Sequence, residues 1–222
     1  MKRKTVFIEN DYVEGGGVEL VLYYLAMHLR EKGYKVTIRT IYDGLADFKK
    51  KYPKDIQYFS PGYDWKDPKF LTPGWWKQKI SWEIYDYKQK RLDRYPFDIG
   101  IAIKEDQSMR DIAQCNARRK FAWVHSDHRY DHWTDYYYKT AEEERSWMEK
   151  FEKVVCVSEA AADSVREVIG DPGGTLDGQN SVVAANVGDG AGAIGRVMTY
   201  GRAVKGSDRT CTGVDDAEAI GA

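Results

Sequence analysis

Three consecutive glycines, Gly15 to Gly17, lie just before an apolar segment that begins at Val18. Backbone N–H groups at the start of a helix favour an anion, and glycines allow a phosphate to approach the chain closely. The run fits neither GxGxxG nor the P-loop, because Val18 and Glu19 follow without a further glycine or a Lys-Ser/Thr pair. Alone, it indicates a phosphate site about as strongly as it indicates a flexible turn.

A histidine stands at the end of the apolar run formed by residues 120–124. The imidazole of His125 could donate or accept a hydrogen bond there, and a histidine that caps the edge of a sheet is the alternative. Further metal-ligating residue types follow it: Asp127, His128, Asp131 and His132. The stretch has no HExxH pattern, and three histidines in one irregular loop need tight folding to meet one ion. We therefore expect no metal site.

Two other polar loops follow apolar segments. Lys104, Glu105 and Asp106 come after residues 99–103 and could hydrogen-bond sugar hydroxyls, although a solvated turn is the simpler explanation. Ser158 precedes a helical segment, and a role as its N-cap explains it fully.

Short apolar runs alternate with helical segments over the first 170 residues. The helix at residues 18–29 is the clearest, because its apolar residues recur at helical spacing and Gly33 follows as a C-cap. A β-rich run at 34–41 comes next, which makes a parallel βαβ unit with the run at 5–8. The remaining expected strands are 56–59, 97–103, 120–124 and 154–157, and the remaining expected helices are 75–94, 139–152 and 159–169.

This alternation predicts an α/β fold, a Rossmann-like, doubly wound and mostly parallel sheet. In such sheets ligands bind beyond the carboxyl ends of the strands, where the polar loops described above would meet.

Composition changes near residue 170. Tyr200 is the only aromatic residue after Gly170, and Gly, Ala, Val, Thr and Asp dominate the rest. The segment shows neither a helical nor a strand period. We expect one domain at residues 1–170 and a poorly ordered tail at 171–222, which is a flexible extension, the divergent start of a second domain or the product of a shifted reading frame.

The balance of charge and the cysteine content bear on nucleic-acid binding and on the cellular compartment. Lys plus Arg number 34 against 35 for Asp plus Glu, so no overall field draws the chain to nucleic acid. The three cysteines are widely spaced and form no disulfide framework. No signal-peptide core follows the basic N-terminus, and no apolar stretch is long enough to cross a membrane. We expect a cytoplasmic protein.

Residues 65–95 interleave four tryptophans with lysines and arginines. This mixture suits a membrane surface, a lipid-linked acceptor or a polyanionic glycan. Because Glu83, Asp86 and Asp93 dilute the basic face, we favour a long amphipathic helix whose aromatic face packs on the sheet.

Four short motifs occur in a fixed order along residues 4–170. They are Gly16-Gly17-Val18-Glu19, Gly33-Tyr34-Lys35-Val36-Thr37, Trp123-Val124-His125 and Val155-Cys156-Val157-Ser158-Glu159. Together they resemble the GGxE helix, the G-(H/Y)-x-V-T strand, the W-x-H strand end and the V-(C/V)-V-S-E segment of the N-terminal, acceptor-side domain of family 4 glycosyltransferases. These enzymes have the two-domain GT-B fold and act in bacterial polysaccharide synthesis.

The resemblance implies a retaining transfer of a sugar from a nucleotide-sugar donor to a glycan or lipid-linked acceptor, with no required metal or other cofactor. It assigns Gly16 and Gly17 to the donor diphosphate and His125 to catalysis at the transferred sugar. The acceptor-side candidates are Glu19, Lys104, Glu105, Asp127 and Ser158.

In this family a second, C-terminal Rossmann domain holds most of the nucleotide, and the sequence does not contain it. We therefore expect a truncated enzyme with very low turnover alone, located in the cytoplasm with peripheral contact at the inner face of the membrane. A non-catalytic module that binds a glycan or a partner protein, and an inactive truncated gene product, are the open alternatives. The absence of GxGxxG disfavours an NAD enzyme.

Overall fold

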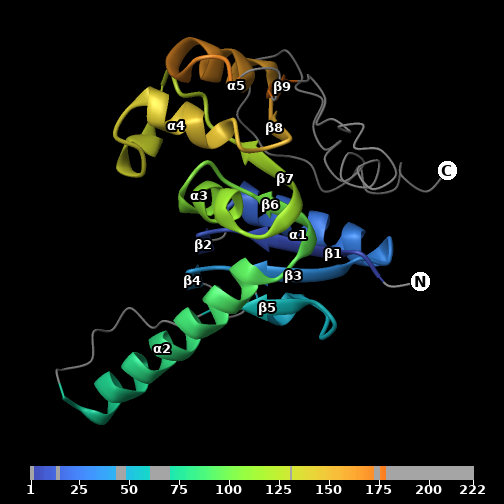
Figure 1. Cartoon of the computed structure of the whole chain (residues 1–222), viewed down its shortest axis with the longest axis vertical. Coiled ribbons are helices and arrows are strands. Elements are labelled where there is room, and N and C mark those ends of the chain that lie inside the picture. The colour runs from blue at the N-terminus through green and yellow to red at the C-terminus, as the bar shows by residue number, and fades with distance from the viewer. Residues whose placement is uncertain are drawn as a thin grey trace.

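The computed structural model describes residues 3–13, 16–43, 49–60, 71–130, 132–172 and 176–178 of the 222-residue chain. Seven strands form one sheet in the order β5-β3-β1-β6-β7-β8-β9, and every neighbouring pair is parallel (Figure 1). They are β1 Thr5–Glu9, β3 Lys35–Arg39, β5 Gln57–Phe59, β6 Phe97–Ala102, β7 Ala117–Val124, β8 Lys153–Cys156 and β9 Leu176–Gly178. The predicted Rossmann-like parallel sheet is therefore confirmed.

Within the described residues, five α-helices connect these strands. They are α1 Gly17–Glu31, α2 Pro73–Arg94, α3 Gln107–Gln114, α4 Ala141–Met148 and α5 Glu159–Ser164, the last of which continues as a π-helical turn, Val165–Ile169. Shorter elements are the 3₁₀ turns Lys49–Lys51 and Trp133–Tyr136 and a separate parallel pair, β2 Tyr12–Val13 with β4 Tyr42–Asp43. In the described part of the chain, no helix combines the length and the apolar character needed to cross a bilayer.

Both faces of the sheet are covered, as the alternation within β1 illustrates. Val6 and Ile8 pack in the cluster that includes Leu22, Leu25 and Leu29 of α1. The intervening Phe7 packs in the opposite cluster, whose members on α3, α4 and the turn after α5 are Ile112, Met148 and Val165. Because successive side chains of a strand point to opposite faces, a strand buried on both sides is apolar on both, as β1 is from Val6 to Ile8.

The start and end of α1 follow from local sequence. Gly16 is the N-cap, and the Glu19 side chain in the first turn reaches back to the Gly16 N–H. Gly33, two residues after the helix, has φ of 85°, a left-handed conformation that favours glycine. The predicted helix and its glycine C-cap region are confirmed.

Helix α2 departs from the expected packing. Tyr85 is its only buried residue, and the helix extends away from the sheet as an arm (Figure 1). The interpretation that its aromatic face packs on the sheet is therefore wrong. Helical spacing shows which residues share a face of a helix, but it does not show whether another element covers that face.

Two more elements differ from expectation. α3 was not predicted, although Met109, Ile112 and Ala113 have helical spacing and Asp106 caps the helix through the Ser108 N–H. β9 pairs with β8 beyond Gly170, so the sheet continues past the predicted change in composition. Apart from residues 171, 172 and 176–178, the predicted tail lies outside the described residues.

Candidate active site

The loops after β1, β6, β7 and β8 lie along one edge of the sheet, because these four strands are parallel neighbours. Backbone hydrogen bonds extend into these loops. The Ile103 N–H donates to the Glu9 carbonyl at 3.0 Å, and the Val157 N–H donates to the Val124 carbonyl at 3.0 Å. Residues far apart in the sequence are thus held close together. We call the set at this edge the carboxyl-edge site: Gly16, Glu19, Lys104, Glu105 and His125.

Glu19 links the start of α1 to the loop after β6. Its carboxylate accepts the Gly16 N–H at 2.6 Å, and its other oxygen lies 3.7 Å from Lys104 Nζ. Lys104 Nζ also donates to the Tyr12 carbonyl at 3.2 Å. A side chain at position 16 would lie 3.2 Å from the Glu19 carboxylate, whereas position 17 is open. The contacts of Glu19 therefore fix the exposed backbone at the helix N-terminus.

Glu105 holds the turn that follows β7. Its fully buried carboxylate accepts the N–H of His125 at 3.1 Å and the N–H of Ser126 at 3.0 Å. The His125 ring hydrogen-bonds to the Ile103 backbone, and its Nε2 has no hydrogen-bond partner among the described residues. Burial lowers the pKa of His125 below its ordinary value of 6.5, although Glu105 opposes this shift. At pH 7 the ring is therefore neutral. Its Nε2 carries a lone pair that can accept a hydrogen bond.

Asp127 and Ser158 also follow strands at this edge, but local contacts occupy them. The Asp127 carboxylate accepts two hydrogen bonds from the Arg129 guanidinium, at 2.6 and 2.9 Å, which lowers its pKa. Ser158 Oγ accepts the Ala161 N–H at 3.1 Å and caps α5. These two residues stay outside the network that joins the carboxyl-edge site.

Two buried aspartates lie in the same loops. From the sequence, Asp106 is grouped with Lys104 and Glu105 as a possible partner of sugar hydroxyls, whereas Asp11 has no assigned role. Asp11 accepts a hydrogen bond from the Tyr137 hydroxyl at 3.4 Å, and burial, with the nearby Asp106 and Asp111, raises the pKa of Asp11 to about 7. Burial also raises the pKa of Asp106 to about 6, although hydrogen bonds from Ser108 oppose this. Carboxyl groups with pKa values near neutrality are frequent at functional sites, and their burial is the signal that the sequence lacks.

A buried ion cluster supports the loop after β1. The Arg39 guanidinium donates to Glu9 at 3.0 and 2.6 Å, to Asp93 at 2.7 Å and to Asp111 at 3.0 Å. Arg39 and Glu9 are paired residues at the ends of β3 and β1, while the other two carboxylates come from α2 and α3. The cluster thus ties four elements together and fixes the direction in which the chain leaves β1.

Several polar atoms at this edge lack a hydrogen-bond partner within the described part of the chain. They include His125 Nε2, Asp11 Oδ1 and both side-chain polar atoms of Asn10. Asn10 is fully buried, and buried polar groups in folded proteins are nearly always paired. Unsatisfied groups gathered where parallel strands end indicate a site for a polar ligand. A polyhydroxyl compound could satisfy such a mixture of donors and acceptors.

Comparison with protein families gives a match to the family described as Glycosyltransferase Family 4, over residues 15–175. The matched region includes every residue of the carboxyl-edge site. The sequence matches none of the curated proteins with which it was compared.

Solved structures also share the fold of this chain, at low sequence identity. One is the apo form of the lipopolysaccharide outer core galactosyltransferase WaaB, with a TM-score of 0.50 and 15% sequence identity. The match covers 83% of this chain and 47% of the WaaB chain. Another is Alr3699/HepE from Anabaena in complex with UDP-glucose, with a TM-score of 0.50, 13% identity, and coverage of 78% and 42%. The chain spans less than half the length of these proteins.

Proposed function

Because the chain belongs to glycosyltransferase family 4, we propose that it forms the acceptor-side half of an enzyme that transfers a sugar from a nucleotide-sugar donor to a glycan or lipid-linked acceptor. Transfer retains the anomeric configuration and serves polysaccharide synthesis. The carboxyl-edge site carries this proposal, because it joins the first turn of α1 to a neutral imidazole through Glu19, Lys104 and Glu105.

In this proposal the donor diphosphate lies against the N-terminus of α1. The backbone N–H groups there attract an anion, and Gly16 and Gly17 are both exposed. His125 Nε2 accepts a hydrogen bond from the transferred sugar, which orients that sugar for reaction. UDP-glucose is a suitable first donor to test, since the Anabaena protein was solved in complex with it.

The acceptor lies along the same edge, on the side of Lys104 and Glu105. Glu105 acts through its hydrogen bonds to the turn at His125, so its contribution is to position the imidazole. A second domain supplies the remaining nucleotide contacts, and transfer by this chain alone is very slow because the leaving nucleotide is poorly stabilised.

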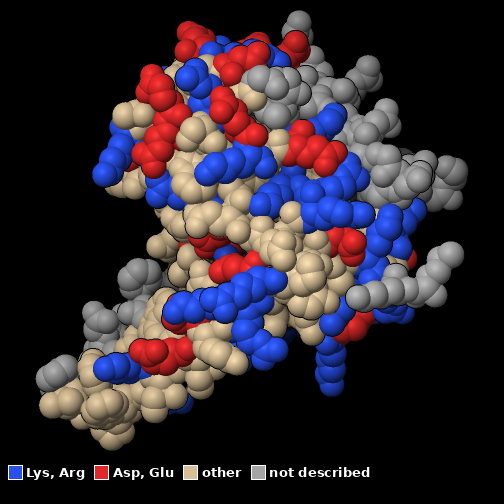
Figure 2. Space-filling view, viewed as in Figure 1, with Lys and Arg blue, Asp and Glu red and all other residues tan. Residues whose placement is uncertain are grey.

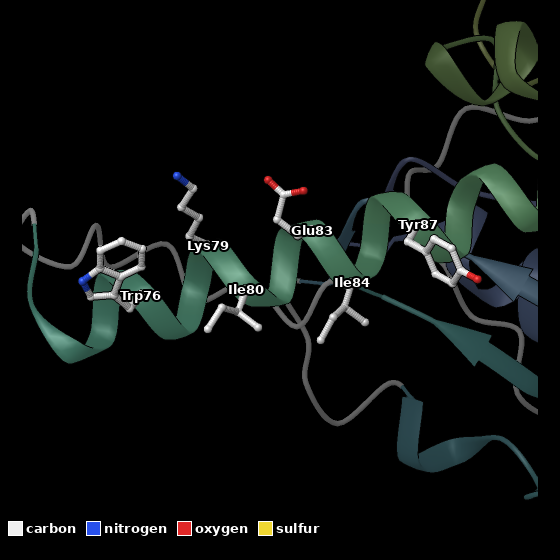
Figure 3. Close-up of a pocket in the computed structure, with 6 residues that line it drawn as sticks. All are labelled: Trp76, Lys79, Ile80, Glu83, Ile84 and Tyr87. Carbon is white, nitrogen blue, oxygen red and sulfur yellow. The ribbon is translucent and has the colours of Figure 1, made fainter.

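The α2 arm extends this proposal to a membrane-linked acceptor. Trp76, Ile80, Ile84 and Tyr87 are all exposed and recur at helical spacing (Figure 3). Ile80 and Ile84 point to one side of the helix, while Lys79 and Glu83 point to the other (Figure 3). Trp, Tyr and aliphatic residues beside lysines suit the boundary between lipid headgroups and acyl chains. We place the lipid end of the acceptor at this arm, on the cytoplasmic face of the membrane.

Backbone NMR of the isotope-labelled chain, titrated with UDP-glucose, tests the donor part of the proposal. We expect saturable and weak binding, with shift changes concentrated at the amides of Gly16, Gly17 and His125. His125→Gln removes the ring contact and should weaken the binding of UDP-glucose more than that of UDP. Uniformly small changes, or changes centred away from this edge, would contradict the assignment.

A transfer assay tests the reaction itself. The chain is incubated with radiolabelled UDP-glucose and a lipid extract, alone and together with a separately produced C-terminal half of a family 4 enzyme. Slow product formation that His125→Gln abolishes supports the proposal, and NMR of the new glycosidic bond decides whether configuration is retained. Saturable glycan binding without transfer in either mixture favours the non-catalytic module instead.

A further inference from the structure

A second cluster of potential ligands lies beside the carboxyl-edge site. His128 and His132 come from the loop after β7, and Glu144 comes from α4. One ligand atom from each lies within 4.8 Å of the others. His132 Nε2 is 3.1 Å from Glu144 Oε2, and the two imidazole rings meet edge to face with centroids 5.2 Å apart.

Glu144 is buried to an extent that is rare for a glutamate side chain. Its side chain is 1% exposed. Oε2 accepts a hydrogen bond from Thr134 Oγ1 at 3.1 Å and contacts His132, but Oε1 has no hydrogen-bond partner within the described ranges. Burial raises the pKa of this carboxyl group, although His132 and Thr134 oppose the shift. A buried carboxylate with an unsatisfied oxygen is costly unless a cation or another donor completes its environment.

The surroundings of the histidines resemble the outer sphere of a metal site. His132 Nδ1 lies 3.3 Å from Asp135 Oδ1, so Nδ1–H can donate a hydrogen bond to this carboxylate and leave Nε2 for an ion. His128 is 2% exposed, and its backbone N–H donates to Ser164 Oγ of α5 at 3.1 Å. The loop is thus anchored before any ion binds, while the 22% exposure of the His132 side chain gives an ion access.

We propose that His128, His132 and Glu144 bind one divalent zinc ion, with water as the fourth ligand. Imidazole nitrogen and carboxylate oxygen are ligands that zinc accepts in tetrahedral geometry. Ligand atoms about 2.1 Å from zinc lie about 3.4 Å apart, close to the observed separation of His132 and Glu144. The ion links the loop that begins at His125 to α4, and this proposal is independent of the sugar-transfer proposal.

This site differs from the metal cluster that the sequence suggests and that we set aside. Asp127 forms an ion pair with Arg129. The His125 ring hydrogen-bonds to the backbone of Ile103, the residue that follows β6. The third ligand comes instead from Glu144, twelve residues beyond the last histidine of the loop and on a different element. Asp131 lies outside the described residues.

Calorimetric titration of the chain with zinc sulphate tests the proposal. All proteins carry Cys211→Ser, which removes one thiol that could bind zinc adventitiously. We expect one ion per chain, and at least about ten-fold weaker binding after His128→Asn, His132→Asn or Glu144→Gln. Asp127→Asn and His28→Asn serve as controls and should leave the affinity unchanged. Equal affinities across all five variants would overturn the proposal.

Cobalt(II) absorption gives a result that does not depend on any variant folding correctly. A tetrahedral site of two imidazoles and one carboxylate gives strong visible d–d bands without a thiolate charge-transfer band. The weak bands of six-coordinate cobalt, or a thiolate band, would contradict the assignment. Thermal unfolding provides a further readout, since zinc should raise the Tm of the parent protein and of the control variants but not that of Glu144→Gln.

Discussion

Burial and the Glu105 carboxylate act in opposite directions on the ionisation of the candidate catalytic imidazole, His125. Burial lowers the His125 pKa, and the Glu105 carboxylate partly restores it. We expect His125 to titrate below 6.5 and Glu105→Gln to lower its pKa further, because the variant removes the charge that favours the imidazolium. The measurement is an NMR titration of the ring protons, with His125→Gln to assign the signal. A pKa above 6.5, or one unchanged by Glu105→Gln, would contradict this electrostatic arrangement.

Asp11 makes the stability of the fold depend on pH in an unusual direction. Its pKa is about 7 in the folded chain against 3.8 ordinarily, so between these pH values the folded state binds more protons than the unfolded state. The free energy of unfolding should therefore fall as pH rises from about 4 to about 7, by at most about 1.4 kcal/mol per pH unit. Asp11→Asn should remove this loss and make the protein more stable at pH 8.

Urea unfolding at a series of pH values measures this effect. Asp55→Asn is the control, because Asp55 is exposed and its pKa is lowered by the hydrogen bond from Arg30. The stability linked to Asp55 is present above its unfolded pKa and lost as pH falls, so its sign is opposite. Parallel pH profiles for wild type and Asp11→Asn would show that Asp11 titrates normally.

These residues also mark what the sequence can reveal. Strand ends identify Lys104, Glu105 and His125, since residue type and chain position suffice to place them at the edge of a parallel sheet. The surroundings of Asp11 include Tyr137, whose hydroxyl donates a hydrogen bond to it from 126 positions away in the sequence. Glu144 likewise joins the proposed zinc site from a separate element. Sequence spacing predicts neighbours within one element, whereas these contacts arise only when separate elements pack.

At the scale of elements, the cluster around Arg39 holds β1, β3, α2 and α3 together. Its guanidinium is fully buried and faces three carboxylates, two of which it binds at 2.7 Å or closer. Arg39→Met should reduce the free energy of unfolding by about 3–5 kcal/mol, because it leaves Glu9 buried without a compensating charge. Arg30→Met is the matched control. Its ion pair with Asp55 is exposed, so the loss should be much smaller than for Arg39→Met.

Urea denaturation followed by circular dichroism measures both variants. A small loss for Arg39→Met would mean that Glu9 becomes protonated or hydrated without cost. A double variant, Glu9→Gln with Arg39→Met, separates these cases, since it should recover part of the stability if the unpaired charge is the cause.

The elements themselves were more predictable than their packing. β1, α1 and β3 follow from an apolar run, an amphipathic period and a glycine with positive φ, all of which are local. The sequence also predicts α2 as a helix, and its N-cap Thr72 accepts the Trp75 N–H. The projection of α2 from the sheet could not be predicted in this way. A helix forms because of residues close in the sequence, whereas the direction of α2 depends on distant contacts. One of them is the hydrogen bond that the Tyr85 hydroxyl donates to the Thr40 carbonyl.

At the scale of the whole molecule, the chain spans less than half the length of WaaB and of HepE, two proteins whose solved structures share its fold. Positive and negative side chains are interspersed on the face seen in Figure 2, whereas the tip of the α2 arm is largely uncharged. The molecule therefore offers no broad charged face in this view, and the arm is its most distinct surface feature. In the proposed function, contact of this arm with a membrane holds the chain at the surface that carries the lipid-linked acceptor.

Substitution of the arm tests this membrane contact. Ile80→Glu with Ile84→Glu should abolish binding to vesicles of phosphatidylglycerol and phosphatidylcholine, because each change replaces an exposed apolar side chain with a charge that resists burial in lipid. Folding should be unaffected, since the two side chains are 56% and 49% exposed. Tyr136→Glu is the control, because Tyr136 is 91% exposed but lies far from the arm in sequence.

Vesicle flotation is the measurement, accompanied by light scattering to determine the number of chains per particle. If the parent protein fails to float and the arm variants instead convert a dimer to a monomer, the apolar row binds a second copy of the chain, and the membrane contact is disproved.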